Sequence, residues 1–202
     1  MVSSWIAPLL RAVPAIALAV VVTFSADHSA TLGLVTFGAF AAASGAVIVV
    51  FALRQEAGLA RNLQLVQGAL GVVAGAAALA VTGGGLSYLV FLVSTWAVAT
   101  GFIELYLGLR ARRSTSADTK AISRDLIFAG ALTVVLAIIV LVLPPDFSQP
   151  FTGPDGVARD LTASVIIVGL LGAYWAVLGV FLVIAALSLK WADAPTPAET
   201  KA

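Results

Sequence analysis

Six long apolar runs separated by short polar segments dominate the sequence. A bilayer core of about 30 Å is crossed by an α-helix of about 20 apolar residues, which is close to the length of each run. Runs such as 12–22 and 126–143 do not alternate apolar and polar residues as the strands of a membrane barrel do. The sequence therefore predicts an all-α integral membrane protein with six transmembrane helices, at 5–24, 32–53, 63–82, 86–109, 126–143 and 161–189.

The composition is typical of a membrane protein and excludes several classes of function. The chain is 61% hydrophobic and 10% charged, whereas soluble domains carry about 25% charged residues. It has no cysteine and one histidine, which excludes thiolate nucleophiles and Cys- or His-rich metal sites. The net charge of +1 gives no electrostatic reason to expect nucleic acid. We expect no cofactor, and the lipid bilayer as the main partner.

The basic residues predict the orientation of the chain. Ten of the eleven fall on one side of the predicted membrane, and the other side has only Arg159. Under the positive-inside rule the basic side is cytoplasmic, so both termini of this multi-pass protein are expected in the cytoplasm. The first run has no basic residue before it and no small-x-small cleavage site at Phe24 and Ala26, so we expect it to be retained rather than cleaved as a signal peptide.

Three polar segments interrupt or follow the helices. The segment 114–120 is predicted to be a short cytoplasmic loop. The outer segment 144–160 contains four prolines and two glycines, which predicts irregular structure, and Asp160 is expected to cap the last helix. Residues 1–191 are predicted to form a single transmembrane domain, and 192–202 a disordered cytoplasmic tail.

The even-numbered runs repeat one pattern of small residues. A gapless shift of 56 residues places the second run on the fourth, and the sixth run continues the pattern. Three helical hairpins of parallel topology follow, at approximately 5–54, 61–110 and 123–190, related by a pseudo-threefold axis along the membrane normal. Small residues seven apart share a helix face and let backbones approach closely. The repeat packing positions are Gly38, Gly45, Ser94, Gly101, Gly172 and Gly179.

The odd-numbered runs share a weaker register, in which Ala12, Gly68 and Gly130 correspond. The segment 71–75 is a GxxxG motif, which indicates close helix packing within the chain or at a dimer interface. A triplet of rings, Phe40, Trp96 and Tyr174, also occupies equivalent positions near the middle of the membrane. These rings either pack together or line a cavity on the pseudo-threefold axis.

The chain has three two-helix units with spaced glycines, and Pro144 closes an odd helix. In these features it resembles the HdeD acid-resistance membrane protein family. The resemblance covers roughly 11–189. The sequence departs from the family pattern at two places. The first and third helices end at Ser25 and Thr82 instead of proline, and 144–160 forms a long loop. The resemblance implies a bacterial inner-membrane protein linked to acid or other envelope stress, and it implies no catalytic residues.

Glu104 is the only charged residue well inside a run, and Arg11 lies at a comparable depth. Because an intramembrane charge is costly, we predict that the two form a structural polar pair between helices. Two alternatives remain open: each side chain reaches separately toward the cytoplasmic interface, or Gln67, the repeat equivalent of Arg11, is the partner of Glu104.

The other candidates for chemistry are weaker. His28 lies in an outer loop beside Asp27, where it is interpreted as a solvated residue rather than a pH sensor. The outer carboxylates at Asp146, Asp155 and Asp160 do not have the spacing of a calcium loop. We expect a non-enzymatic protein with a stress-related or complex-stabilising role, in a homo-oligomer or a membrane-protein complex. The alternative is a small transporter or channel with a cavity between the repeats.

Overall fold

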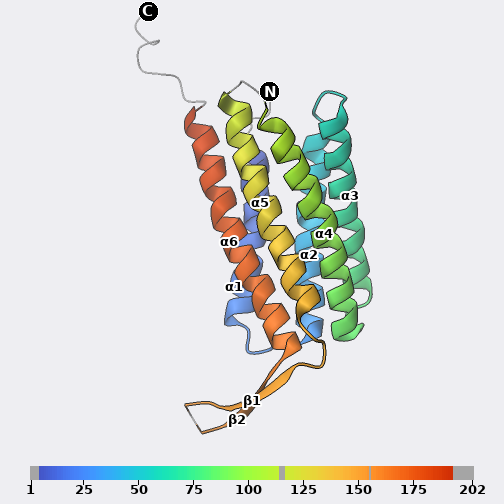
Figure 1. Ribbon diagram of the computed structural model, residues 1–202, viewed down its shortest axis with the longest axis vertical. Helices are drawn as coiled ribbons and strands as arrows, with labels where there is room; N and C mark the ends of the chain where they lie inside the picture. The colour runs from blue at the N-terminus through green and yellow to red at the C-terminus, as the bar shows by residue number, and fades with distance from the viewer. Residues whose placement is uncertain (1–4, 114–116, 155, 193–202) are drawn as a thin grey trace, which may run out of the picture.

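The computed structural model describes residues 5–113, 117–154 and 156–192. Within these ranges the chain forms six helices and one two-stranded sheet (Figure 1). All six helices are long and apolar enough to cross a membrane, which confirms the predicted all-α membrane fold. The elements are α1 (Ile6–Phe24), α2 (Ala30–Ala52), α3 (Leu59–Ala80), α4 (Gly85–Ala111), α5 (Ala117–Val142), β1 (Ser148–Thr152), β2 (Ala158–Thr162) and α6 (Ala163–Ala192).

The helices run alternately up and down, so the bundle has two distinct ends. The first and last described residues lie at one end, and the β1–β2 hairpin extends from the other (Figure 1). We call the first the basic end, because it carries arginines and a lysine in or just after the terminal turns of α2, α3, α4 and α6. These residues are Arg54, Arg61, Arg110, Arg112, Arg113 and Lys190.

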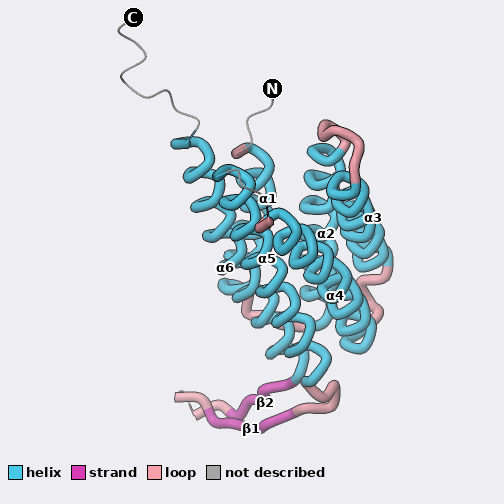
Figure 2. The backbone as a smooth tube through the Cα atoms, turned by 45° about the horizontal axis from the view of Figure 1, so that its top comes forward, coloured by secondary structure: helices cyan, strands magenta, loops and turns pink. Residues whose placement is uncertain are grey.

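The helices form an inner set and an outer set. The even helices α2, α4 and α6 are the more buried ones and meet at the centre through their aromatic rings, whereas the odd helices are less buried. Figure 2 shows α6 and α3 at opposite edges of the bundle. The closest packing joins α2 to α3, α4 to α5, and α6 to α1. Each close interface therefore joins neighbouring repeats, and the two helices of one predicted hairpin pack less closely. The contact between α6 and α1 closes the ring.

The repeated glycines explain which helices pack most closely. A Cβ atom added to Gly45 of α2 would lie 2.6 Å from the Gly68 carbonyl oxygen of α3. The equivalent atom on Gly101 would lie 3.1 Å from the Gly130 oxygen of α5, and that on Gly179 would lie 3.2 Å from the backbone nitrogen of Ile16 in α1. Side chains at these positions would separate the helices, so the close approach of each even helix to its neighbour depends on the small residues there.

The other repeat glycines and the GxxxG motif contact the same neighbours. An added Cβ at Gly38 would lie 3.0 Å from the Gly75 oxygen, and one at Gly172 would meet Val22 of α1. Gly71 and Gly75 both pack against the α2 backbone, so the motif serves packing within the chain. Ser94 donates a hydrogen bond to the Phe91 carbonyl within α4, at 3.3 Å.

Two predictions about the polar segments are wrong. The segment 144–160 is not irregular throughout, because β1 and β2 pair antiparallel with Pro150 opposite Asp160. The missing N–H of Pro150 is tolerated because both strands of a two-stranded sheet are edges, and Gly156 adopts a φ of +76° before β2. Asp160 therefore lies within a strand and does not cap α6, which begins at Ala163.

The predicted cytoplasmic loop 114–120 is also shorter than expected. Helix α5 begins at Ala117, since alanine, lysine and neighbouring polar residues sustain a helix outside the apolar run. The predicted disordered tail lies outside the described residues, except for Ala192, which ends α6. Asp155, one of the outer carboxylates, lies outside them too.

Candidate functional site, a pocket at the basic end

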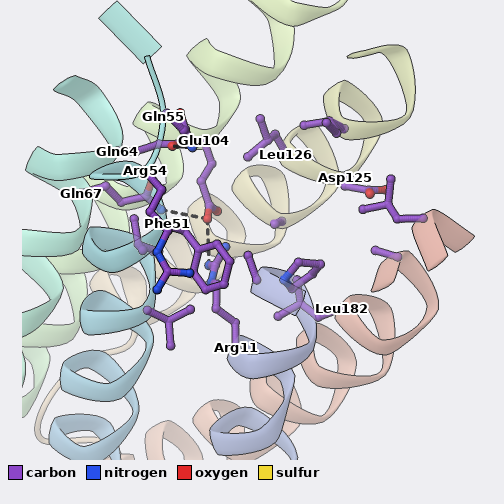
Figure 3. A pocket seen from close by; sticks show the side chains of 18 residues that line it. Arg11, Phe51, Arg54, Gln55, Gln64, Gln67, Glu104, Asp125, Leu126 and Leu182 are labelled. Atoms are coloured by element: carbon purple, nitrogen blue, oxygen red, sulfur yellow. Dashed lines mark hydrogen bonds and ion pairs between the residues drawn. The ribbon is translucent and has the colours of Figure 1, made fainter. Parts of the chain in front are cut away.

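Four helices place polar side chains around a single buried carboxylate. Glu104 of α4 is 1% exposed, and its Oε1 accepts a hydrogen bond at 3.0 Å from Arg11 Nη2 of α1. The same oxygen accepts a second bond at 2.9 Å from Gln67 Nε2 of α3. Arg11 Nε in turn donates to Ser44 Oγ of α2 at 3.2 Å. Figure 3 shows the Arg11 and Gln67 side chains pointing toward the Glu104 carboxylate.

The structure thus brings together the two residues that the sequence analysis paired. Gln67 joins Arg11 on Glu104 and does not replace it. The Arg11 side chain is 16% exposed, so neither member of the pair reaches separately into solvent. Opposite charges at hydrogen-bond distance offset part of the desolvation cost of burying each one, and the network ties four helices together within the apolar bundle.

A pocket of about 520 Å³ opens above this network at the basic end. Its volume lies within the range of small-molecule sites, and its walls are mostly apolar with a few polar groups, as is usual for such sites. It reaches the surface at Arg54 and Gln55, whose side chains are exposed. All six helices contribute to its wall, which includes Ala7, Pro8, Val47, Phe51, Gln64, Asp125, Leu126, Ala185 and Leu189.

Corresponding positions of all three predicted repeats line the pocket. Three sets of repeat-equivalent positions line it, two from the odd helices and one from the even helices. The three sets, each given in repeat order, are Pro8, Gln64 and Leu126; Arg11, Gln67 and Ala129; and Ile48, Glu104 and Leu182. Equivalent positions therefore carry unlike side chains: in these three sets the polar groups come from the first two repeats, and the third repeat contributes only apolar ones.

An aromatic layer closes the centre of the bundle beyond this network. The repeat-equivalent rings of Phe40, Trp96 and Tyr174 contact one another, with centroids 5.9–6.5 Å apart and near-perpendicular planes. Phe37 and Trp175 extend the cluster. These edge-to-face contacts are the favoured geometry for aromatic pairs, so the rings fill the axis and do not line a cavity there.

The layer also contains polar atoms. Tyr174 shares a 3.0 Å hydrogen bond with Thr133 of α5, between its phenol oxygen and Oγ1. The indole nitrogen of Trp175 and Thr100 Oγ1 are buried without a hydrogen-bond partner in the described structure. The centre is thus tightly packed but not wholly apolar.

The remaining candidates are not part of the site. Asp146 and Asp160 lie at the end of the bundle opposite the pocket, and His28 is in the loop before α2. Within 5–113, 117–154 and 156–192, no group of His, Cys, Asp or Glu is placed to hold a metal ion.

The sequence analysis missed two polar residues of this region. Ser44 was hidden among the small residues of its run, and Asp125 was placed just outside the fifth run. The extension of α5 to Ala117 puts Asp125 on the pocket wall. An acidic residue immediately before an apolar run was the signal that could have identified it.

Comparison with known proteins gives one match. Residues 10–80 and again 66–142 match the family model of a short repeat of unknown function (DUF308). The two matches begin 56 residues apart, 10 to 66, which is the offset found in the sequence itself. No curated protein and no solved structure matches the chain.

Proposed function

The chain belongs to the DUF308 short-repeat family, and from this membership and its closed centre we propose a non-enzymatic role in the bacterial inner membrane. The role is HdeD-like: stress-related, with acid as the first stress to test, or stabilising for a membrane complex. The aromatic layer carries the proposal. Rings that fill the axis at Phe40, Trp96 and Tyr174 favour a stable packed bundle over an open channel.

The charge distribution supports an orientation with both termini in the cytoplasm. The basic end holds the arginines and lysine that flank four helices, whereas the described part of the opposite end has Arg159 as its basic residue. Positive residues are retained on the cytoplasmic side of short loops. In this orientation the pocket opens to the cytoplasm and the β1–β2 hairpin faces outward.

One observation favours a second candidate, a small transporter. The pocket lies between the repeats. It opens at the basic end, and the aromatic layer closes the bundle beyond it, as expected of a substrate site in one state of an alternating-access cycle. Transport would require the rings at the centre to separate.

A deletion strain tests the stress role. Loss of the gene is expected to lower survival in acid or in another envelope stress while growth at neutral pH is unchanged, and the wild-type gene should restore survival. Unchanged survival across several stresses would contradict this role.

Native mass spectrometry of the gently solubilised protein tests the complex-stabilising role. A co-purifying membrane protein supports it. A chain that appears alone or only as copies of itself, together with normal stress survival, favours the transporter.

A further inference from the structure

The third repeat breaks the symmetry of the pocket. Where the first repeat places Arg11 and the second places Gln67, the third places Ala129, which is 3% exposed and lines the pocket. Both long side chains donate hydrogen bonds to Glu104, but a methyl group cannot. The wall formed by α5 and α6 therefore leaves a sector of the pocket without a donor.

Glu104 retains an unused acceptor beside this sector. Its Oε1 receives both hydrogen bonds, and its Oε2 receives none from the residues that the structure describes. A buried carboxylate is stabilised when both oxygens accept hydrogen bonds. A ligand that donates to Oε2 would supply the contact that the third repeat lacks.

The charge around the empty sector favours a cation. Asp125 lies one helical turn from Ala129 on the same wall and adds a second carboxylate. Of the positive side chains nearby, Arg11 is already bonded to Glu104 and Ser44, and Arg124, next to Asp125 in α5, is exposed and does not line the pocket. Arg54 lies on the opposite side of the pocket from Asp125 (Figure 3), with its guanidinium 5.5 Å from the centre of the Phe51 ring.

The rest of this wall is hydrocarbon. Leu126, Leu182, Ala185 and Leu189 line it, so a ligand that fits must combine a cationic donor with an apolar body. An anion would have to displace Arg11 from its partners and would face two carboxylates. A ligand without an apolar part would leave the leucine wall in contact with water.

We propose that this sector of the pocket binds a small organic cation, an aliphatic ammonium whose nitrogen donates to Glu104 and whose hydrocarbon part packs on α5 and α6. The proposal goes beyond the proposed function, because such a ligand can be either a structural component or a transported substrate. A negative survival assay would leave it unaffected.

Thermal unfolding of the purified full-length chain in detergent tests the proposal, with n-hexylammonium chloride as the probe. A ligand that binds only the folded state raises the Tm in proportion to the logarithm of its concentration above Kd. We expect a saturable rise with n-hexylammonium. Sodium hexanoate, which has a similar alkyl chain and the opposite charge, and sodium chloride at equal ionic strength should give no such rise.

Two variants and a matched control locate the site. Ala129→Gln transplants the residue of the second repeat into the third, so it should fill the sector, donate to Glu104 and abolish the rise in Tm. Asp125→Asn removes the charge of the second carboxylate on this wall, so a higher concentration of n-hexylammonium should be needed for the same rise in Tm. Asp146→Asn removes a carboxylate at the other end of the bundle and should bind as the wild type does.

Three outcomes would overturn the proposal. An equal rise in Tm with hexanoate would indicate that the alkyl chain partitions without regard to charge. No rise in Tm with either compound would indicate a pocket filled by water alone. A rise in Tm with n-hexylammonium that persists in Ala129→Gln would place binding elsewhere. If Ala129→Gln fails to fold, Asp125→Asn against Asp146→Asn still decides the question, because both are single polar substitutions outside the packed centre.

Discussion

Removing the charge of Glu104 should destabilise the bundle far more than an isosteric change usually does. Glu104→Gln keeps the side-chain shape and an oxygen that can accept from Gln67. It leaves the Arg11 guanidinium, which is 16% exposed, without a counter-charge at 3.0 Å. The converse change, Arg11→Gln, leaves a carboxylate that is 1% exposed without its cation. Each single substitution therefore strands one charge inside the bundle.

The magnitude follows from the distance and the burial. Two unit charges about 4 Å apart interact by about 4 kcal/mol at an effective dielectric constant near 20. Breaking a buried pair by removing one partner commonly costs about 3–5 kcal/mol. The double variant removes both charges and both desolvation costs. It should therefore lose less stability than the sum of the single variants, by about 0.5–3 kcal/mol.

The free energy of unfolding is measured for the wild type, the two single variants and the double variant. Each protein is unfolded at equilibrium in mixed micelles by titrating an anionic detergent into a mild one. Arg11→Gln combined with Asp146→Asn is the control, because Asp146 lies at the opposite end of the bundle. Those two changes should be additive. If Arg11→Gln and Glu104→Gln also add within about 0.5 kcal/mol, the two side chains are not energetically coupled and the network is not a structural pair.

Two further predictions concern packing and orientation. Gly75→Ala should destabilise the protein by about 1–3 kcal/mol, because the new Cβ would lie within 2.6 Å of backbone atoms of α2. The Cβ of Gly169→Ala would meet nothing within 4 Å, so this control should be neutral or slightly stabilising in the same unfolding assay, because alanine favours a helix. Equal destabilisation by the two changes would refute the packing argument. Reporter fusions after Lys120 and after Lys190 should be cytoplasmic and a tag inside 148–156 should be external; a cytoplasmic tag in that segment would reverse the orientation.

Much of the fold is determined by the sequence because a membrane leaves few choices. Backbone in lipid must be helical or part of a barrel, so long non-alternating apolar runs predict helices directly, and each predicted span corresponds to an observed helix. The buried pair could be inferred for a related reason. A charge inside an apolar run is rare and costly, so Glu104 and Arg11 stand out from their surroundings.

Only the tertiary structure decided which repeat packs against which. The glycine register showed that close approach occurs at Gly45 and Gly101, but a small face fits any partner with a matching small face, and the chain contains six such faces. The structure pairs each even helix with the odd helix of the adjacent repeat. Likewise, the prolines and glycines of 144–160 predicted irregular structure, but β1 and β2 pair there. Strand pairing depends on a partner strand more than on local propensity, so the sequence did not indicate it.

The pocket also depends on tertiary structure. Its wall combines side chains from all six helices, and the small size of Ala129 matters only because Arg11 and Gln67 occupy the equivalent places around the axis. Asp125 became part of the wall through the extra turns of α5. The sequence determined the spans, the repeat and the buried charges, because each follows from local hydropathy or spacing. The cavity remains because the small side chains of the third repeat do not fill the space between the assembled helices, and no local sequence pattern specifies that space.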